Sequence, residues 1–134
     1  MSMKLFQDAI KVDQAIYPRN ISSTNVTSSY YSVANCHGFA FIISFGSIAT
    51  DIVAQAYQDI STATNAVVLG AAKTFAYATY TLTNYVMEFN TAELTINSGY
   101  DKVAINLSAA STGGYCSAIL VRYFLRWNPS SLLS

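Results

Sequence analysis

Residues 102–108 read Lys-Val-Ala-Ile-Asn-Leu-Ser and alternate apolar side chains with small or polar ones. A period of two is typical of a β-strand, whose side chains point alternately to opposite faces of a sheet. Val103, Ile105 and Leu107 are therefore predicted to face a core. No long helical pattern separates this strand from the others, so a parallel α/β sheet is disfavoured and an all-β fold is expected.

The same period recurs along most of the chain. Residues 38–45, Gly-Phe-Ala-Phe-Ile-Ile-Ser-Phe, are apolar in both phases of the alternation and predict a core strand buried on both faces. Further strands are predicted over 51–58, 66–75, 82–89 and 115–127. Gly70 indicates either a bulge or a bend between two short strands. Turn signals about every ten residues are typical of an antiparallel β-sandwich or barrel, here jelly-roll-like.

The length of 134 residues predicts one domain, a β-sandwich over 30–128 followed by a tail over 129–134. Residues 1–29 are expected to form an N-terminal arm. Their apolar residues also fit one face of an amphipathic helix that Pro18 would end. The Ser/Thr/Asn-rich composition of 21–32 favours an extended arm that lies across a neighbouring chain. The N-terminus shows no signal-peptide pattern, which predicts folding in a cytosol.

Charged side chains are scarce. They make up 10% of the residues and hydrophobic ones 52%, whereas about a quarter of a soluble domain is normally charged. No apolar run approaches the roughly 18 to 20 residues needed to cross a bilayer. The formal net charge of +0 provides no excess to attract nucleic acid or an anionic membrane. We therefore expect sister chains or a larger particle to cover much of the uncharged surface.

The sequence offers no constellation for catalysis, for a cofactor or for a metal. His37 is the single histidine, and its place at the start of the most hydrophobic strand favours a structural role. Cys36 and Cys116 are too few for a disulfide framework and too far apart for a zinc motif, so both are expected to be reduced packing residues. The carboxylates show no spacing that would bring several together. Gly113 and Gly114 predict a hairpin turn rather than a phosphate loop.

Contacts with partners are predicted at three places. The N-terminal segment is expected to be ordered only against another chain. Tyr77 and Tyr80 are candidates for an exposed aromatic patch, although aromatic residues also pack across strands within one sheet. Arginine and tryptophan at the end of the last strand are favoured as interface anchors. The residues expected at partner contacts are Leu5, Phe6, Ile10, Ile16, Tyr17, Tyr77, Tyr80, Arg122, Arg126 and Trp127.

Several segments resemble a family of small virion proteins of tailed bacteriophages. They are the run Phe39-Ala-Phe-Ile-Ile-Ser-Phe-Gly-Ser-Ile-Ala-Thr-Asp and, in order, Val53-Ala-Gln-Ala-Tyr-Gln-Asp, Gly70-Ala-Ala-Lys-Thr, Ala92-Glu-Leu, Asn97-Ser-Gly-Tyr-Asp-Lys-Val and Ser117-Ala-Ile-Leu-Val-Arg. The likeness covers residues 30–128 and rests on a diffuse pattern rather than on a catalytic motif. Members of this family are encoded among head genes and are structural, capsid-decoration or cement proteins.

The resemblance implies a β-sandwich that binds assembled major capsid protein and reinforces the head, with no reaction and no cofactor. It also implies a place on the capsid exterior of the virion and synthesis in the host cytoplasm. A homotrimer or a homodimer is expected, because phage assembly commonly uses symmetric clusters. Two other functions stay open: a carbohydrate-binding β-sandwich in host attachment, favoured by the tyrosines, and a component of the tail or of the head-to-tail connector.

Overall fold

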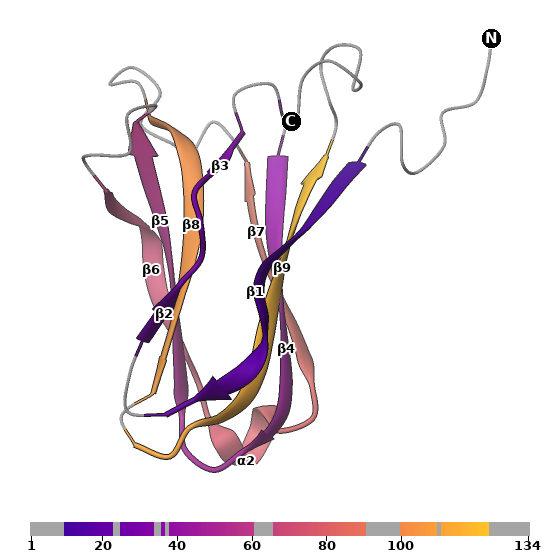
Figure 1. The fold of residues 1–134 in the computed structure, drawn as a ribbon, viewed down its shortest axis with the longest axis vertical. Coiled ribbons are helices and arrows are strands. Elements are labelled where there is room, and N and C mark those ends of the chain that lie inside the picture. Colours follow the sequence, from indigo (N-terminus) through magenta and orange to yellow (C-terminus); the bar gives the residue numbers. More distant parts are fainter. Residues whose placement is uncertain are drawn as a thin grey trace, which may run out of the picture.

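The computed structural model describes residues 10–22, 25–33, 36, 38–60, 66–90, 100–109 and 111–123. In these residues the chain forms two antiparallel β-sheets, which lie face to face as the layers of a sandwich (Figure 1). The first sheet contains, in order, β1 (Ile10–Ile21), β9 (Gly114–Tyr123), β4 (Gly38–Ile48) and β7 (Asn84–Asn90). The second contains, in order, β2 (Asn25–Thr27), β8 (Tyr100–Ala109), β5 (Ile52–Ile60) and β6 (Val67–Phe75), with β3 (Tyr31–Ser32) also paired to β8.

The strands are paired in a nested order. β1 pairs with β9, β2 and β3 with β8, β4 with β7, and β5 with β6, always antiparallel. β2 and β3 lie along successive parts of β8, so they act as two pieces of one interrupted strand. A stack of nested antiparallel pairs that is folded over on itself gives a double-sheet jelly roll. The all-β, jelly-roll-like sandwich expected from the sequence is confirmed.

The core lies between the two sheets, and β4 and β8 fill its centre. Phe39, Phe41 and Ile43 of β4 are fully buried. The inward residues of β8 are buried as the sequence predicts, and they are Val103, Ile105 and Leu107. Complete burial of a side chain of this size contributes about 1.5–3 kcal/mol. The other side of β4 differs from the expectation of burial on both faces. Ile42 and Ser44 stay partly exposed, because no third layer covers the first sheet within the described residues.

Residues 10–21 form a strand of the sandwich rather than a helix or a separate arm. β1 pairs with β9 along one edge of the first sheet, and Ile16 and Ile21 are buried in the core of the same chain. Pro18 fits because β1 is an edge strand whose register shifts between Ile16 and Arg19, and a missing N–H is tolerated at such a place. Another irregularity interrupts the pairing just before Ile16. The part of the predicted arm before residue 10 lies outside the described residues.

The chain crosses from the second sheet to the first through a short helix, α2 (Tyr77–Tyr80), at one end of the sandwich (Figure 1). Just before it, β6 contains the bulge predicted from the sequence, in which Gly70 has a φ of 72°. Just after it, Leu82 has a φ of 58°, a conformation that is rare for a bulky side chain. The Leu82 N–H donates to the Gly46 carbonyl oxygen at 2.9 Å, which holds this turn against β4.

Gly113 and Gly114 form the turn between β8 and β9, but the predicted hairpin is wrong, because β8 and β9 belong to different sheets and the turn carries the chain from one sheet to the other. The N–H of Gly113 donates to Thr50 Oγ1 at 2.7 Å, and its carbonyl oxygen accepts the N–H of Ala49 at 2.6 Å. Gly113 has a φ of 54°, and a Cβ built on it would collide with the carbonyl oxygen of Ile21. This turn therefore packs its backbone directly against two other segments and leaves no room for a side chain.

Gly113→Ala should lower the free energy of unfolding by about 3 kcal/mol, because backbone atoms must move apart as well as accept a strained φ. Gly70→Ala is a matched control. It also has a positive φ, but its nearest new contact would be Phe89 Cε1 at 3.5 Å, an ordinary packing distance. We expect a loss of about 1 kcal/mol there. Urea unfolding followed by circular dichroism measures both, and equal losses would contradict the steric explanation.

Candidate functional site

The outward side of the first sheet carries a continuous group of apolar side chains, called the apolar face below. Strand alternation places these residues opposite the core residues of the same strands. Val12 and Val86, on the two edge strands, are 48% and 53% exposed. The register aligns the face in two neighbouring rows. One row contains Val12, Val121 and Ala40 and ends at Glu88, and the other begins at Gln14 and contains Ile119, Ile42 and Val86.

Glu88 is the one charged residue at the outward positions of β4, β7 and β9. Tyr123 of β9 reaches across β4 at Gly38, where an added Cβ would lie 2.9 Å from the phenol ring. The Tyr123 hydroxyl donates a hydrogen bond to the Glu88 carboxylate. This bond satisfies part of the carboxylate within the protein itself. Glu88 pairs with Ala40, so it is the one charge in the two rows, and its carboxylate accepts a hydrogen bond within the chain.

Exposed apolar residues continue toward the end of the sandwich where α2 lies. Tyr17 of β1 and Tyr115 of β9 are both well exposed on neighbouring strands. Leu82, in the turn after α2, is 77% exposed. Tyr115 and Leu82 both lie close to Gly46 of β4, the first by packing and the second through its backbone hydrogen bond. A bulky apolar side chain that is both exposed and held at positive φ is a candidate for a contact.

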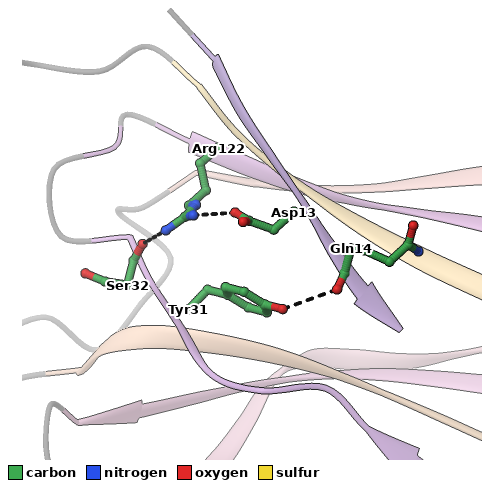
Figure 2. Close-up of polar contacts among 5 residues, drawn as sticks. All are labelled: Asp13, Gln14, Tyr31, Ser32 and Arg122. Atoms are coloured by element: carbon green, nitrogen blue, oxygen red, sulfur yellow. Dashed lines mark hydrogen bonds and ion pairs between the residues drawn. The ribbon is translucent and has the colours of Figure 1, made fainter. Parts of the chain in front are cut away.

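Arg122 of β9 lies on the inward side of the first sheet and ties it to the second (Figure 2). Its guanidinium forms an ion pair with Asp13 of β1 and donates to the carbonyl oxygen of Ser32 in β3 at 2.9 Å. The guanidinium carbon is 5.7 Å from the centroid of the Tyr31 ring, and the Tyr31 hydroxyl donates to the Gln14 carbonyl oxygen at 3.4 Å. This polar cluster closes the side of the sandwich between β1 and β3.

The ion pair is required because Arg122 has little access to water. Its side chain is 3% exposed, against 25% for Asp13, and its Nε has no hydrogen-bond partner among the described residues. A buried charge that loses its partner typically destabilises a protein by about 3–5 kcal/mol. Burial and the Asp13 carboxylate raise the pKa of Tyr31, so its hydroxyl stays protonated and continues to donate near neutral pH. The cluster is therefore a structural device, and it exposes no reactive group.

Aromatic rings close the opposite side of the sandwich, between β6 and β7. The centroid of the Phe75 ring is 4.9 Å from those of Phe45 and Tyr85 and 5.0 Å from that of Tyr80. The Lys73 ammonium lies 5.3 Å from the centroid of the Tyr85 ring, where a cation is attracted to the ring face. Tyr80 is half-buried in this cluster. Of the two interpretations of Tyr80, the packing of aromatic residues across strands is therefore the one that agrees with its position.

The residues that the sequence predicts at partner contacts differ in their exposure in the structure. Tyr17 and Tyr77 are exposed, and Ile10 is partly buried. Ile16 and Arg122 differ from the expectation, because both face inward and are covered by their own chain. Arg122 continues the inward alternation of its strand, and Asp13 makes its burial tolerable. The remaining predicted residues lie outside the described part of the chain, and they are Leu5, Phe6, Arg126 and Trp127.

The described residues hold no group of three potential metal ligands, and none of their helices is long and apolar enough to cross a bilayer. Neither Cys36 nor Cys116 forms a disulfide, and both are buried, as packing residues are expected to be. Burial raises the pKa of Cys116 to about 11. Its thiol therefore stays protonated near neutral pH, and the reactive thiolate form is scarce. His37 lies outside the described residues.

The fold resembles solved structures from a prophage and from a virus. The crystal structure of the SPBc2 prophage-derived protein YomS has a TM-score of 0.61 and 14% identity over 90% of this chain and 98% of YomS. The VP2 subviral particle of infectious bursal disease virus has a TM-score of 0.54 and 10% identity over 96% of this chain. The structure of T=1 particles derived from the same virus has a TM-score of 0.53 and 14% identity over 96% of this chain.

This chain spans 35% and 34% of those two viral chains, about one third of their length. No protein-family model matches the chain, and no curated protein matches it either. At such low identities the similarity establishes a shared fold. The chain therefore has the fold of a prophage-derived protein and of part of a viral particle protein.

Sequence reasoning missed two features of these surfaces. The apolar face was indicated by residues 38–45, which are apolar on both sides of the predicted strand. The alternation does not show, however, whether another layer covers the outward side of the first sheet. Asp13 was missed as the partner of Arg122, because it lies in the segment predicted to be an arm. Its place beside Arg122 follows from the pairing of β1 with β9, in which Lys11 faces Arg122 and Asp13 faces Leu120.

Asp13→Ala should lower the free energy of unfolding by about 3 kcal/mol, because it leaves the Arg122 guanidinium buried without its counter-charge. Adding Arg122→Met to that variant should restore most of the loss, since a buried ion pair replaced by apolar groups is often nearly neutral. Urea unfolding of the parent, both single variants and the double variant measures the coupling between them. Additive losses in the double variant would show that the two side chains act independently.

Proposed function

We propose that the protein is a structural component of a tailed-phage virion, a cement or decoration protein that binds assembled major capsid protein and reinforces the head. The observation that carries the proposal is the apolar face of the first sheet, in which Glu88 is the one charged outward residue of β4, β7 and β9, in a chain with 10% charged residues. A contiguous apolar surface that is exposed to water in the isolated chain is typical of interfaces between proteins. The proposal assigns no reaction to the chain.

The apolar face is suited to a contact of modest strength that is repeated many times. A fully buried valine or isoleucine contributes about 1.5–3 kcal/mol, but association must first offset lost translational and rotational freedom. A few half-exposed residues such as Val12 and Val86 therefore support moderate affinity at one site. A subunit that bridges neighbouring capsid proteins multiplies this contribution over many equivalent sites. Contacts without charge also keep their strength when the salt concentration changes.

Two further observations support the proposal. The segments of the chain that resemble phage virion proteins include most of β4, β5 and β9, which build both sheets. The double-sheet jelly roll is also an architecture of viral capsid domains, and the fold similarity to YomS and to VP2 is compatible with such a role. On the head exterior we expect the protein to act as a homotrimer or homodimer, because a closed symmetric cluster can match the symmetry of the capsomers beneath it.

Val86→Lys should weaken binding to heads that lack this protein by at least about ten-fold, because the lysine ammonium would lose its hydration in the contact. Val68→Lys is the matched control, since Val68 is 56% exposed on edge strand β6 of the second sheet. Co-sedimentation with purified expanded heads measures binding, and thermal disruption of the loaded heads measures reinforcement. Unchanged binding by the Val86 variant, or no gain in heat resistance from the parent protein, would refute the proposal.

Leu82→Gly should stabilise the isolated protein by about 0.5–1 kcal/mol, because glycine accepts the φ of 58° without strain. The same change should weaken binding to heads, since it removes an exposed apolar contact. Leu82→Ala separates the two effects, because alanine loses the side chain but keeps the strain. Thermal unfolding and the same sedimentation assay measure both. If Leu82→Gly and Leu82→Ala had equal stability, the strain would be absent.

A further inference from the structure

The outward side of the second sheet carries a hollow that the apolar face does not include. Tyr57 of β5 and Asn106 of β8 project away from the core, because the residues before and after each of them are buried. The hollow has a volume of about 340 Å³. Small-molecule sites commonly measure about 300–1,000 Å³. The residues that line it are Asn25, Thr27, Tyr30, Tyr57, Ala66 and Asn106.

Hydrogen bonds between side chains hold the polar part of this hollow in place. The Asn106 amide nitrogen donates to Thr27 Oγ1 at 2.7 Å and to Asn25 Oδ1 at 3.4 Å. These bonds use neither the amide protons of Asn25 nor the carbonyl oxygen of Asn106. A ligand would therefore meet a donor and an acceptor whose positions are already fixed, which reduces the entropy lost on binding.

Two phenol side chains form the apolar part of the hollow. Tyr30 follows β2 and Tyr57 belongs to β5, so the rings come from separate segments of the chain. Burial, then the nearby Asp59 and Tyr57, raise the pKa of Tyr30, so its hydroxyl is protonated and can donate near neutral pH. Tyrosine offers a large apolar body with a hydrogen-bonding tip, and it loses little conformational entropy on binding because its side chain has only two χ angles.

We propose that this hollow binds a neutral saccharide. A sugar ring presents C–H groups that pack on aromatic rings and hydroxyls that both donate to and accept from amides. The described lining contains no lysine, arginine, aspartate or glutamate, and the nearby Asp59 is buried, so an anionic or cationic ligand would find no accessible counter-charge there. A purely apolar ligand would bury the amides and the Thr27 hydroxyl without compensation. The mixture of tyrosine, asparagine and threonine therefore favours a neutral polyol over either alternative.

The two outward surfaces of the sandwich point in opposite directions (Figure 1). A subunit that docks on a capsid through the apolar face would consequently present the hollow to the medium. This orientation rests on the proposed function, whereas saccharide binding by the isolated chain does not. The hollow would give a particle many weak sites for surface glycans of a cell, whose strength adds through multivalency.

An array of neutral and acidic oligosaccharides, probed with the purified full chain, tests the inference. We expect binding to neutral members, and titration calorimetry with the best of them should show an affinity about ten-fold weaker for Tyr57→Ala. Thr27→Val preserves side-chain shape at an exposed edge position and should weaken binding about 2–10-fold by releasing Asn106. Tyr77→Ala, at an exposed tyrosine on α2, should bind like the parent.

The inference is overturned if no neutral oligosaccharide binds above background, if acidic members are preferred, or if Tyr57→Ala and Thr27→Val both bind like the parent. Equal loss in Tyr77→Ala would overturn it as well, because the binding would then not depend on the hollow. Val86→Lys should retain saccharide binding while losing attachment to heads. Failure of docking and failure of saccharide binding are therefore seen in separate assays.

Discussion

The structure depends on closing the two open sides that any pair of stacked sheets leaves between its edge strands. At those sides the apolar core would otherwise meet water. The chain closes one side with charge, through Arg122, Asp13 and the carbonyl oxygen of Ser32, and the other with aromatic rings around Phe75. Both closures join residues from different sheets, so they also fix how the layers are stacked. With the sides closed, the outward faces become the surfaces on which binding can develop.

Much of the fold could be predicted from the alternation of apolar and polar side chains along the sequence. The alternation in 38–45 and 102–108 identified the inward residues of β4 and β8, and the glycines located the bulge in β6 and the turn before β9. β1 could not be predicted in this way. Its two register irregularities break the period, and Pro18 is locally a signal against regular structure. Pairing with β9, a contact between the two ends of the chain, decides its conformation.

The candidate surfaces were less accessible to sequence reasoning. The low content of charged residues predicted that part of the surface is covered by other molecules. It did not identify the face, because the alternation of side chains distinguishes the two sides of a strand but does not show which side another sheet covers. Arg122 shows the same limit. Its position in β9 places it on the same side as the buried Ala118 and Leu120, whereas its charge suggested an exposed anchor. Its burial is possible because Asp13, about a hundred residues away in the sequence, forms an ion pair with it. The hollow likewise combines residues from β2, β5 and β8 that have no common sequence signal.

Three of the four sheet edges in the described residues are interrupted. β1 has two irregularities and Pro18, β2 and β3 are short pieces of one strand, and β6 is bulged at Gly70. A long regular edge would be a template for adding a strand from another copy. Interrupted edges make such additions unfavourable, whereas the fourth edge, β7, pairs with β4 without a register shift. Three edges of this sparsely charged molecule therefore resist the amyloid-like addition of strands, and β7 is the edge at which such an addition would meet the least obstruction.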